Sequence, residues 1–127
     1  MRVIYGIGID SVEIGRVEKI LERWGERFTT KVYSPFEIDY CKNRVFPAMH
    51  YAARFAAKES FLKAASIGLW MGIRLKDIEV LNNREGRPEI KLHAKAKEIL
   101  RDNGISAVHL SLSHTAMLAV AIVILEQ

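Results

Sequence analysis

The sequence has 127 residues and a mass of 14.4 kDa, and we expect one domain over residues 1–127. Half of its residues are hydrophobic and 27% are charged, a composition that excludes an intrinsically disordered chain. The formal net charge of +4 suits an acidic partner but is too small to indicate nucleic acid by itself.

The sequence contains a single cysteine, Cys41, so neither an internal disulfide nor a cysteine-based zinc site can form. This cysteine usage and an N-terminal segment unlike a signal peptide predict a cytoplasmic protein. The most hydrophobic stretch, residues 116–125, is too short to cross a membrane as a helix. We expect it to form a buried C-terminal strand, and we expect no membrane partner.

The first half of the chain begins with an expected strand over residues 2–11. Gly6 and Gly8 interrupt it, and glycines inside a strand indicate either a bulge or the close approach of another backbone. Hydrophobic residues then recur with the helical period, which predicts a helix over residues 13–24. Residues 34–37, Ser-Pro-Phe-Glu, have the pattern of a capping box and predict the start of a second, short helix.

The second half begins with the longest expected helix, over residues 48–65, which are rich in alanine and lack glycine and proline. Residues 76–81 and 88–92 are expected to form a hairpin across an Asn-Asn-Arg-Glu-Gly turn. The chain is completed by a helix and two strands, over residues 93–103, 108–112 and 117–125. This order predicts an α+β fold with a mostly antiparallel sheet packed against a long central helix.

Two carboxylates stand out as candidates for chemistry. Asp10 follows the glycine-containing strand, where it suits either a hard cation or the N-cap of the next helix. On the long helix, Glu59 and Lys63 are four residues apart and share a face, as do Arg54 and Lys58. A carboxylate beside several cations is what a magnesium–phosphate site needs, but a salt-bridged helix surface has the same spacing. Both interpretations stay open.

Two further motifs follow in the second half of the chain. The hairpin turn ends in Gly86, Arg87 and Pro88. Glycine there supplies a positive φ, and the arginine is a spare phosphate contact. The strand that begins at residue 108 places alternate polar residues on one face, and a second histidine follows them: His109, Ser111, Ser113 and His114. This face is either the solvent side of an edge strand or part of a binding cleft.

The first expected helix carries a stripe of basic residues, Arg16, Lys19 and Arg23. The stripe is either a solvated face or a docking surface for an acidic protein helix. No nucleic-acid recognition motif accompanies it, and we expect no nucleic-acid partner.

Taken in order, four motifs resemble the holo-acyl-carrier-protein synthase family, the short bacterial-type 4′-phosphopantetheinyl transferases: GIGIDSVEI, RFAAKESFLKA, the Asn-x-x-x-Gly-x-Pro turn and HLSLSH. The resemblance implies transfer of the 4′-phosphopantetheine arm of coenzyme A to a serine of apo acyl carrier protein. It further implies Mg²⁺ as cofactor, adenosine 3′,5′-bisphosphate as by-product, and a role in fatty acid biosynthesis. The family also implies a homotrimer with sites between subunits.

Carried over motif by motif, the resemblance makes Asp10 and Glu59 the magnesium ligands and Lys63 the cation on the transferred phosphate. The serine proton would go to Glu59 or to a metal-bound water, and the sequence leaves this open. The implied coenzyme A contacts are Arg54, Lys58, Lys63, Gly86, Arg87, Pro88, Ser111, Ser113 and His114. The basic stripe gains an acidic partner in the carrier protein. After the long helix, Ser66-Ile67-Gly68 stands where the family usually has Gly-Thr-Gly.

Two other functions compete with this hypothesis. A small basic binding module for an acidic protein or RNA would explain the charge but not the two carboxylate motifs. A magnesium-dependent coenzyme A or nucleotide hydrolase would use the same carboxylates and lysine with water as the acceptor. Such a hydrolase would act without any carrier protein.

Overall fold

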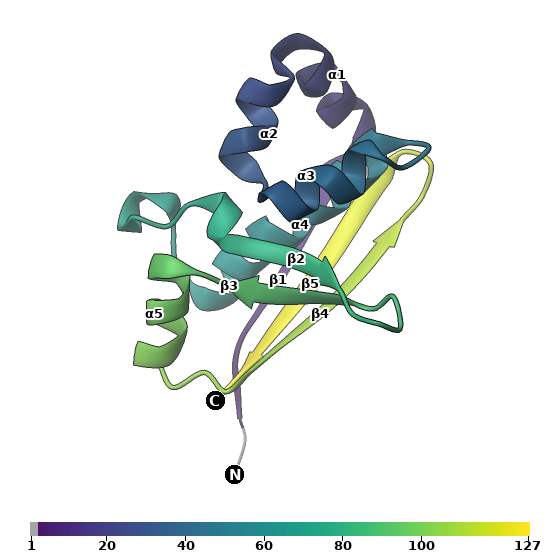
Figure 1. Cartoon of the computed structure of the whole chain (residues 1–127). Coiled ribbons are helices and arrows are strands. Elements are labelled where there is room, and N and C mark those ends of the chain that lie inside the picture. The colour runs from purple at the N-terminus through teal and green to yellow at the C-terminus, as the bar shows by residue number, and fades with distance from the viewer. Residues whose placement is uncertain (1–2) are drawn as a thin grey trace.

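A computed structural model describes residues 3–127, apart from the side chain of Trp70. In chain order its elements are β1 (Ile4–Glu13), α1 (Ile14–Trp24), α2 (Glu26–Val32), α3 (Pro35–Lys42), α4 (Pro47–Ala65), the 3₁₀ helices η1 (Leu69–Met71) and η2 (Leu75–Asp77), β2 (Ile78–Asn82), β3 (Pro88–Leu92), α5 (Ala94–Asp102), β4 (Ala107–His114) and β5 (Leu118–Glu126). β1, β5 and β4 form a three-stranded antiparallel sheet in that order, and β2 pairs with β3 in a two-stranded antiparallel sheet (Figure 1). The predicted α+β class is confirmed.

The long helix α4 lies directly against the three-stranded sheet because β1 has two glycines at the contact. A Cβ atom on Gly6 would lie 1.9 Å from the carbonyl oxygen of Ala64, and one on Gly8 would lie 1.8 Å from that of Ser60. Any side chain at either position would force the helix away from the strand. The Ser60 hydroxyl secures the contact on β5 by donating to the carbonyl oxygen of Ala121 at 3.0 Å. The predicted close approach of a second backbone is confirmed at both glycines, and the other predicted alternative, a bulge or irregular register, is also present between Ile4 and Gly6.

Alanines allow α4 to fit between the two sheets. Ala56 and Ala57 are completely buried and share a cluster with Val80 of β2 and Ala121 of β5. A helix that is buried on most of its surface needs small residues rather than a single hydrophobic stripe. The alanine-rich pattern that predicted the helix therefore also explains its central position (Figure 1).

Three shorter helices precede α4 and cover one end of the molecule. Ser34 begins α3: its hydroxyl accepts from the N–H of Glu37 at 3.2 Å, and its own N–H donates to Glu37 Oε1 at 2.9 Å. The predicted capping box is confirmed. Helix α1 ends at Trp24 because Gly25 adopts a φ of 52°, and α2 begins directly after it.

Several boundaries differ from the expected ones. Helix α2 is not predicted by the sequence pattern, since its seven residues are few and its threonines and valine favour helix only weakly. Strand β1 continues to Glu13, and its expected first residue, Arg2, lies outside the described residues. The hydrophobic C-terminal stretch forms β5 as predicted. Within residues 3–127, no helix is both long enough and apolar enough to span a membrane.

Candidate functional site

Asp10 and Glu59 line one cavity of about 360 Å³ between β1, α1 and α4. The packing of α4 on β1 brings them together, although they are far apart in the sequence. Burial raises the pKa of Glu59, and the negative charge of Asp10 raises it further against the opposing charge of Lys63. A carboxylate whose ionised form is disfavoured in this way, beside a second carboxylate, forms a donor set that a divalent cation satisfies.

Lys63 lies beside these carboxylates. Its ammonium group donates to Asp10 Oδ1 at 3.1 Å and to the carbonyl oxygen of Ile9 at 3.0 Å. Its side chain is 55% exposed, so the charge remains accessible to a ligand. The bond to Asp10 runs between α4 and β1, and Glu13 rather than Asp10 is the N-cap of α1. Both structural alternatives for these residues, a helix cap and a surface pair within α4, are therefore wrong.

The donor set suits one kind of metal site. Among the residues that the structure describes, no group of three or more His, Cys, Asp or Glu side chains is placed to hold a metal ion. Magnesium commonly takes one or two carboxylates and completes its shell with water and phosphate oxygens. Asp10 and Glu59 therefore fit magnesium together with a phosphate ligand rather than as a complete protein cage.

Lys58 lies in the interior and faces no cleft. Its ammonium group donates to Glu37 Oε1 at 2.8 Å and to the carbonyl oxygens of Leu75 and Ile78 at 2.9 Å and 2.6 Å. Both side chains of the Lys58–Glu37 pair are 0% exposed. Burial lowers the pKa of Lys58, while Glu37 opposes this effect. The expected contact of Lys58 with coenzyme A is contradicted, because three acceptors already take its three hydrogens.

Arg54 lines a different cavity, of about 480 Å³, between α3, α4 and β2. Its Nη2 donates to Asn82 Oδ1 at 2.8 Å, and Asn82 Nδ2 donates to the carbonyl oxygen of Gly86 at 3.1 Å. The residue is 3% exposed, and its Nε is buried without a hydrogen-bond partner. Arg54 is thus tied to the predicted hairpin turn, and its guanidinium keeps unused donors.

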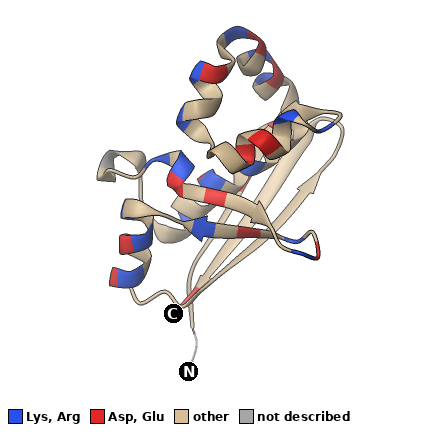
Figure 2. Ribbon diagram, in the orientation of Figure 1, with Lys and Arg blue, Asp and Glu red and all other residues tan. Residues whose placement is uncertain are grey.

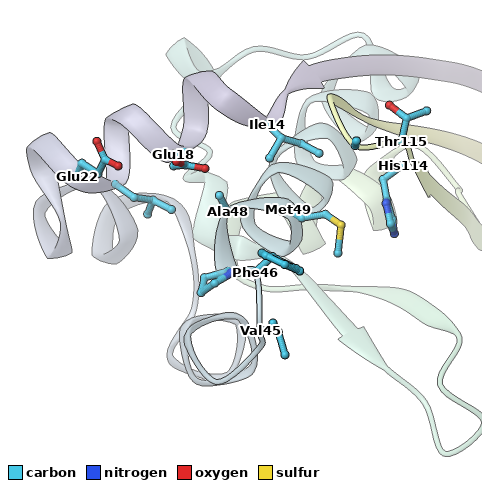
Figure 3. Close-up of a pocket in the computed structure, with 12 residues that line it drawn as sticks. Ile14, Glu18, Glu22, Val45, Phe46, Ala48, Met49, His114 and Thr115 are labelled. Carbon is cyan, nitrogen blue, oxygen red and sulfur yellow. The ribbon is translucent and has the colours of Figure 1, made fainter.

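The turn itself and the end of β4 are exposed. Gly86 has a φ of 82°, as a turn glycine should, and Arg87 is exposed beside it. The polar residues of β4 are also exposed: Ser111, Ser113 and His114. His114 lines a mainly apolar groove of about 890 Å³, in which Phe46 and Met49 also lie (Figure 3).

Basic side chains gather around the Arg54 cavity. His50 of α4 has its pKa lowered by burial and then by the charges of Arg54, Arg44 and His114. These groups therefore lie within electrostatic reach of one another, although His114 belongs to the neighbouring groove. The carboxylate cavity is lined by none of them. Asp10 and Glu59 thus line one cavity, the acidic one, and Arg54 lines a separate, basic one.

The predicted basic stripe extends along α1 from the carboxylate cavity. Arg16, Lys19 and Arg23 are all exposed, and Arg16 also lines that cavity. The guanidinium of Arg23 lies over the ring of Trp24, which is 46% exposed. An exposed arginine and tryptophan together suit a protein partner that is both acidic and apolar.

Ser66 ends α4 in the left-handed region, with φ 56° and ψ 42°. A residue with a Cβ atom costs about 1–2 kcal/mol in this conformation, which explains why the family pattern has glycine at this position. Ser66, where the sequence departs from the family pattern, lies three positions beyond Lys63. The departure replaces neither Asp10 nor Glu59.

Comparisons with known proteins identify the family. A family profile described as the 4′-phosphopantetheinyl transferase superfamily matches residues 6–121. The chain is 59% identical to the holo-acyl-carrier-protein synthase of Syntrophus aciditrophicus over 124 residues, which cover 98% of this chain and 97% of that protein. It is 50% identical to the enzyme of the same type from a Geobacter species over 125 residues, which cover 98% and 100%.

Solved structures share the fold. The holo-acyl-carrier-protein synthase of Neisseria meningitidis matches with a TM-score of 0.91 at 31% identity, over 98% of this chain and 100% of that one. The Helicobacter pylori enzyme, solved in complex with coenzyme A, matches with a TM-score of 0.82 at 34% identity, over 94% and 98%. The chain therefore belongs to the 4′-phosphopantetheinyl transferase superfamily and is an enzyme of the holo-acyl-carrier-protein synthase type.

Proposed function

We propose that this enzyme transfers the 4′-phosphopantetheine arm of coenzyme A to a serine of an apo acyl carrier protein, in the cytoplasm and in support of fatty acid biosynthesis. The observation that carries the proposal is the pair of carboxylates, Asp10 and Glu59, in one cavity beside Lys63. In the reaction the serine oxygen bonds to the β-phosphorus of the pyrophosphate. The bond between that phosphorus and the oxygen of the departing nucleotide phosphate breaks, and adenosine 3′,5′-bisphosphate leaves. The serine proton would pass to Glu59 or to a water molecule beside it.

The residues of the cavity have distinct roles in this proposal. Asp10 and Glu59 would hold magnesium, which when bound neutralises charge on the phosphate oxygens. The Lys63 ammonium, 3.1 Å from Asp10 and half exposed, can donate to the transferred phosphate and stabilise the charge that develops there. The sides of the cavity keep the pyrophosphate in line with the serine, which supplies much of the remaining acceleration.

The Arg54 cavity suits the other end of coenzyme A. With the pyrophosphate beside Lys63, the remaining anionic group of this substrate is its 3′-phosphate. Arg54 is buried and keeps unused donors, and Arg44 lines the same cavity. Two guanidinium groups recognise a phosphate better than neutral donors do. We assign the 3′-phosphate to this cavity and the adenine to the adjoining turn at Gly86, Arg87 and Pro88, with Ser111, Ser113 and His114 on the opposite rim.

A homotrimer would bring the carboxylate cavity of one chain and the Arg54 cavity of another together. Ile7 and Ile9 are 56% and 59% exposed, and the register sets them beside Ile124 and Ile122 of β5. Figure 2 shows β4 and β5 almost without charged residues. The exposed isoleucines of β1 and the half-buried isoleucines of β5, bordered on β4 by the polar His109, Ser111 and Ser113, form a face that is typical of an interface. Packing of subunits through it would place the Arg54 cavity of one chain next to the carboxylate cavity of its neighbour.

This arrangement predicts complementation between two defective variants, Glu59→Gln and Arg54→Ala. Co-expression should restore about a quarter of the wild-type activity at limiting coenzyme A, since a random trimer forms that fraction of sites from two intact residues. The control is co-expression of Glu59→Gln with Glu59→Ala, which should restore nothing. Equal activity in the two mixtures would show that each site draws both residues from one chain.

The basic stripe is expected to bind the carrier protein. Arg23→Glu should raise the apparent KM for the carrier by about tenfold or more and leave the KM for coenzyme A unchanged, because it reverses a charge at the rim of the interface. Steady-state transfer with each substrate varied in turn measures both constants. Lys95→Glu on α5 is the matched control, since Lys95 is exposed outside the stripe. A defect confined to coenzyme A would refute the docking role.

Chromatography of the nucleotide product distinguishes this function from a hydrolase. With coenzyme A and magnesium, adenosine 3′,5′-bisphosphate should appear only after apo carrier protein is added, and in equal amount to the carrier modified. Release of the same product without carrier would show that water is the acceptor. No release under either condition would favour a binding role.

A further inference from the structure

Tyr40 of α3 touches the positive groups of the Arg54 cavity. Its ring centroid lies 4.0 Å from Cζ of Arg44 and 4.2 Å from Cζ of Arg54. The ring of His50 meets it edge-on, at 5.7 Å and an interplanar angle of 78°. His50 and Arg54 are four residues apart on α4 and therefore lie on one face of that helix. One aromatic ring thus connects the turn after α3 with α4.

The surroundings of this ring leave the two guanidinium groups without a charged partner. Asp39 lines the same cavity, but its carboxylate accepts from Asn43 at 3.3 Å. Within residues 3–127, neither Arg44 nor Arg54 forms an ion pair with a carboxylate. Two like charges at one ring repel each other, and the negative face of the tyrosine offsets this repulsion.

The orientation of these arginines matters for an anionic ligand. A guanidinium group binds a phosphate through two parallel hydrogen bonds when its plane is fixed, and loses this advantage when it rotates freely. Arg54 is held by Asn82 on one side and by the tyrosine ring on the other. Arg44 is held by the ring and by its Nε, which donates to the carbonyl oxygen of Tyr40 at 3.3 Å.

We propose that Tyr40 is a positioning residue for coenzyme A, whose ring keeps the guanidinium groups of Arg44 and Arg54 directed at one anionic group of the substrate. The identity of that group as the 3′-phosphate rests on the proposed function. Tyr40 lines the Arg54 cavity and does not line the carboxylate cavity. Its contribution therefore falls on the binding of coenzyme A and not on the chemical step.

The test compares the wild-type enzyme with Tyr40→Leu and Tyr40→Phe in steady-state transfer. Each is assayed with coenzyme A and with dephospho-coenzyme A, which lacks the 3′-phosphate. Tyr40→Leu should raise the KM for coenzyme A about tenfold, with kcat within about twofold of wild type. Tyr40→Phe should retain the wild-type KM because it keeps the ring face. The KM for dephospho-coenzyme A should be the same in all three.

A further variant covers the case in which Tyr40→Leu does not fold. A fluorinated phenylalanine at position 40 keeps the shape of the ring and weakens its negative face, and it should raise the KM for coenzyme A. An equal rise of the KM for dephospho-coenzyme A would overturn the proposal, as would a loss of kcat alone or a Tyr40→Phe enzyme as weak as Tyr40→Leu. If the wild-type enzyme binds coenzyme A and dephospho-coenzyme A equally, the 3′-phosphate assignment is wrong. That result concerns the proposed function and is distinct from the results that would overturn the role of Tyr40.

Discussion

Transfer by Asp10→Asn or Glu59→Gln is expected to be at least about 100-fold slower than by the wild-type enzyme at saturating substrates. Each amide has the volume of the acid it replaces but lacks the charge that a magnesium ion needs. The two carboxylates share one cavity, so the loss of either one removes half of the protein's donor set. Release of adenosine 3′,5′-bisphosphate in the presence of apo carrier protein measures the rate.

Thermal stability separates this effect from damage to the fold. Burial and the charge of Asp10 both raise the pKa of Glu59, so its ionised form is disfavoured in the folded protein. Glu59→Gln removes this disfavoured charge from the carboxylate cavity. The melting temperature should therefore stay the same or rise. Glu98→Gln on α5 is the matched control, since Glu98 is exposed and outside both cavities. Activity close to wild type in both amide variants would show that the metal assignment is wrong.

Replacement of the buried Lys58 by methionine is expected to lower the free energy of unfolding by about 3–5 kcal/mol. Methionine fills similar space but leaves the Glu37 carboxylate, which is 0% exposed, without its cation. The carbonyl oxygens of Leu75 and Ile78 lose a donor as well. Urea unfolding monitored by circular dichroism gives the free energy.

Two variants isolate the cause of that loss. Lys95→Met removes an exposed lysine from α5 and should cost less than about 1 kcal/mol. The double variant Lys58→Met/Glu37→Gln should be more stable than Lys58→Met alone, because a neutral glutamine can still accept from the N–H of Ser34. A single variant as stable as wild type, or a double variant less stable than the single, would contradict the structural role of the pair.

The features that sequence predicts well are local ones. The Ser34 capping box needs contacts only within one turn, and it forms as the pattern indicates. The hairpin of β2 and β3 follows from a turn sequence between two short strands. Gly6 and Gly8 indicate a bulge or a close contact, because glycine in a strand interior commonly marks one or the other. The sequence does not say which backbone approaches, and the structure identifies it as that of α4.

The features that sequence misses depend on residues far apart in the chain. Lys58 shares a helix face with Arg54, but its partner Glu37 lies in another helix, so the pattern on α4 alone suggests a ligand contact. Helix α2 has a weak intrinsic preference and depends on the burial of Thr29 and Val32. Tyr40 carries no sequence signal, because its role arises only where α3 meets α4.

The division of the predicted residues between two places is also invisible in the sequence. The family resemblance assigns four residues from separate motifs to one site: Asp10, Glu59, Arg54 and His114. The fold puts the carboxylates on the side of β1 and α1, and Arg54 on the side of α3 and β2. The proposed trimer would reunite them by pairing the carboxylate cavity of one chain with the Arg54 cavity of its neighbour.

The intact mass of an apo acyl carrier protein, before and after incubation with the enzyme, coenzyme A and magnesium, tests the central claim most directly. The proposed function predicts a gain of one phosphopantetheine on the carrier, which is lost when a chelator is present or when the enzyme carries Glu59→Gln. A carrier whose mass stays unchanged with the wild-type enzyme, while a known transferase modifies the same preparation, would contradict it.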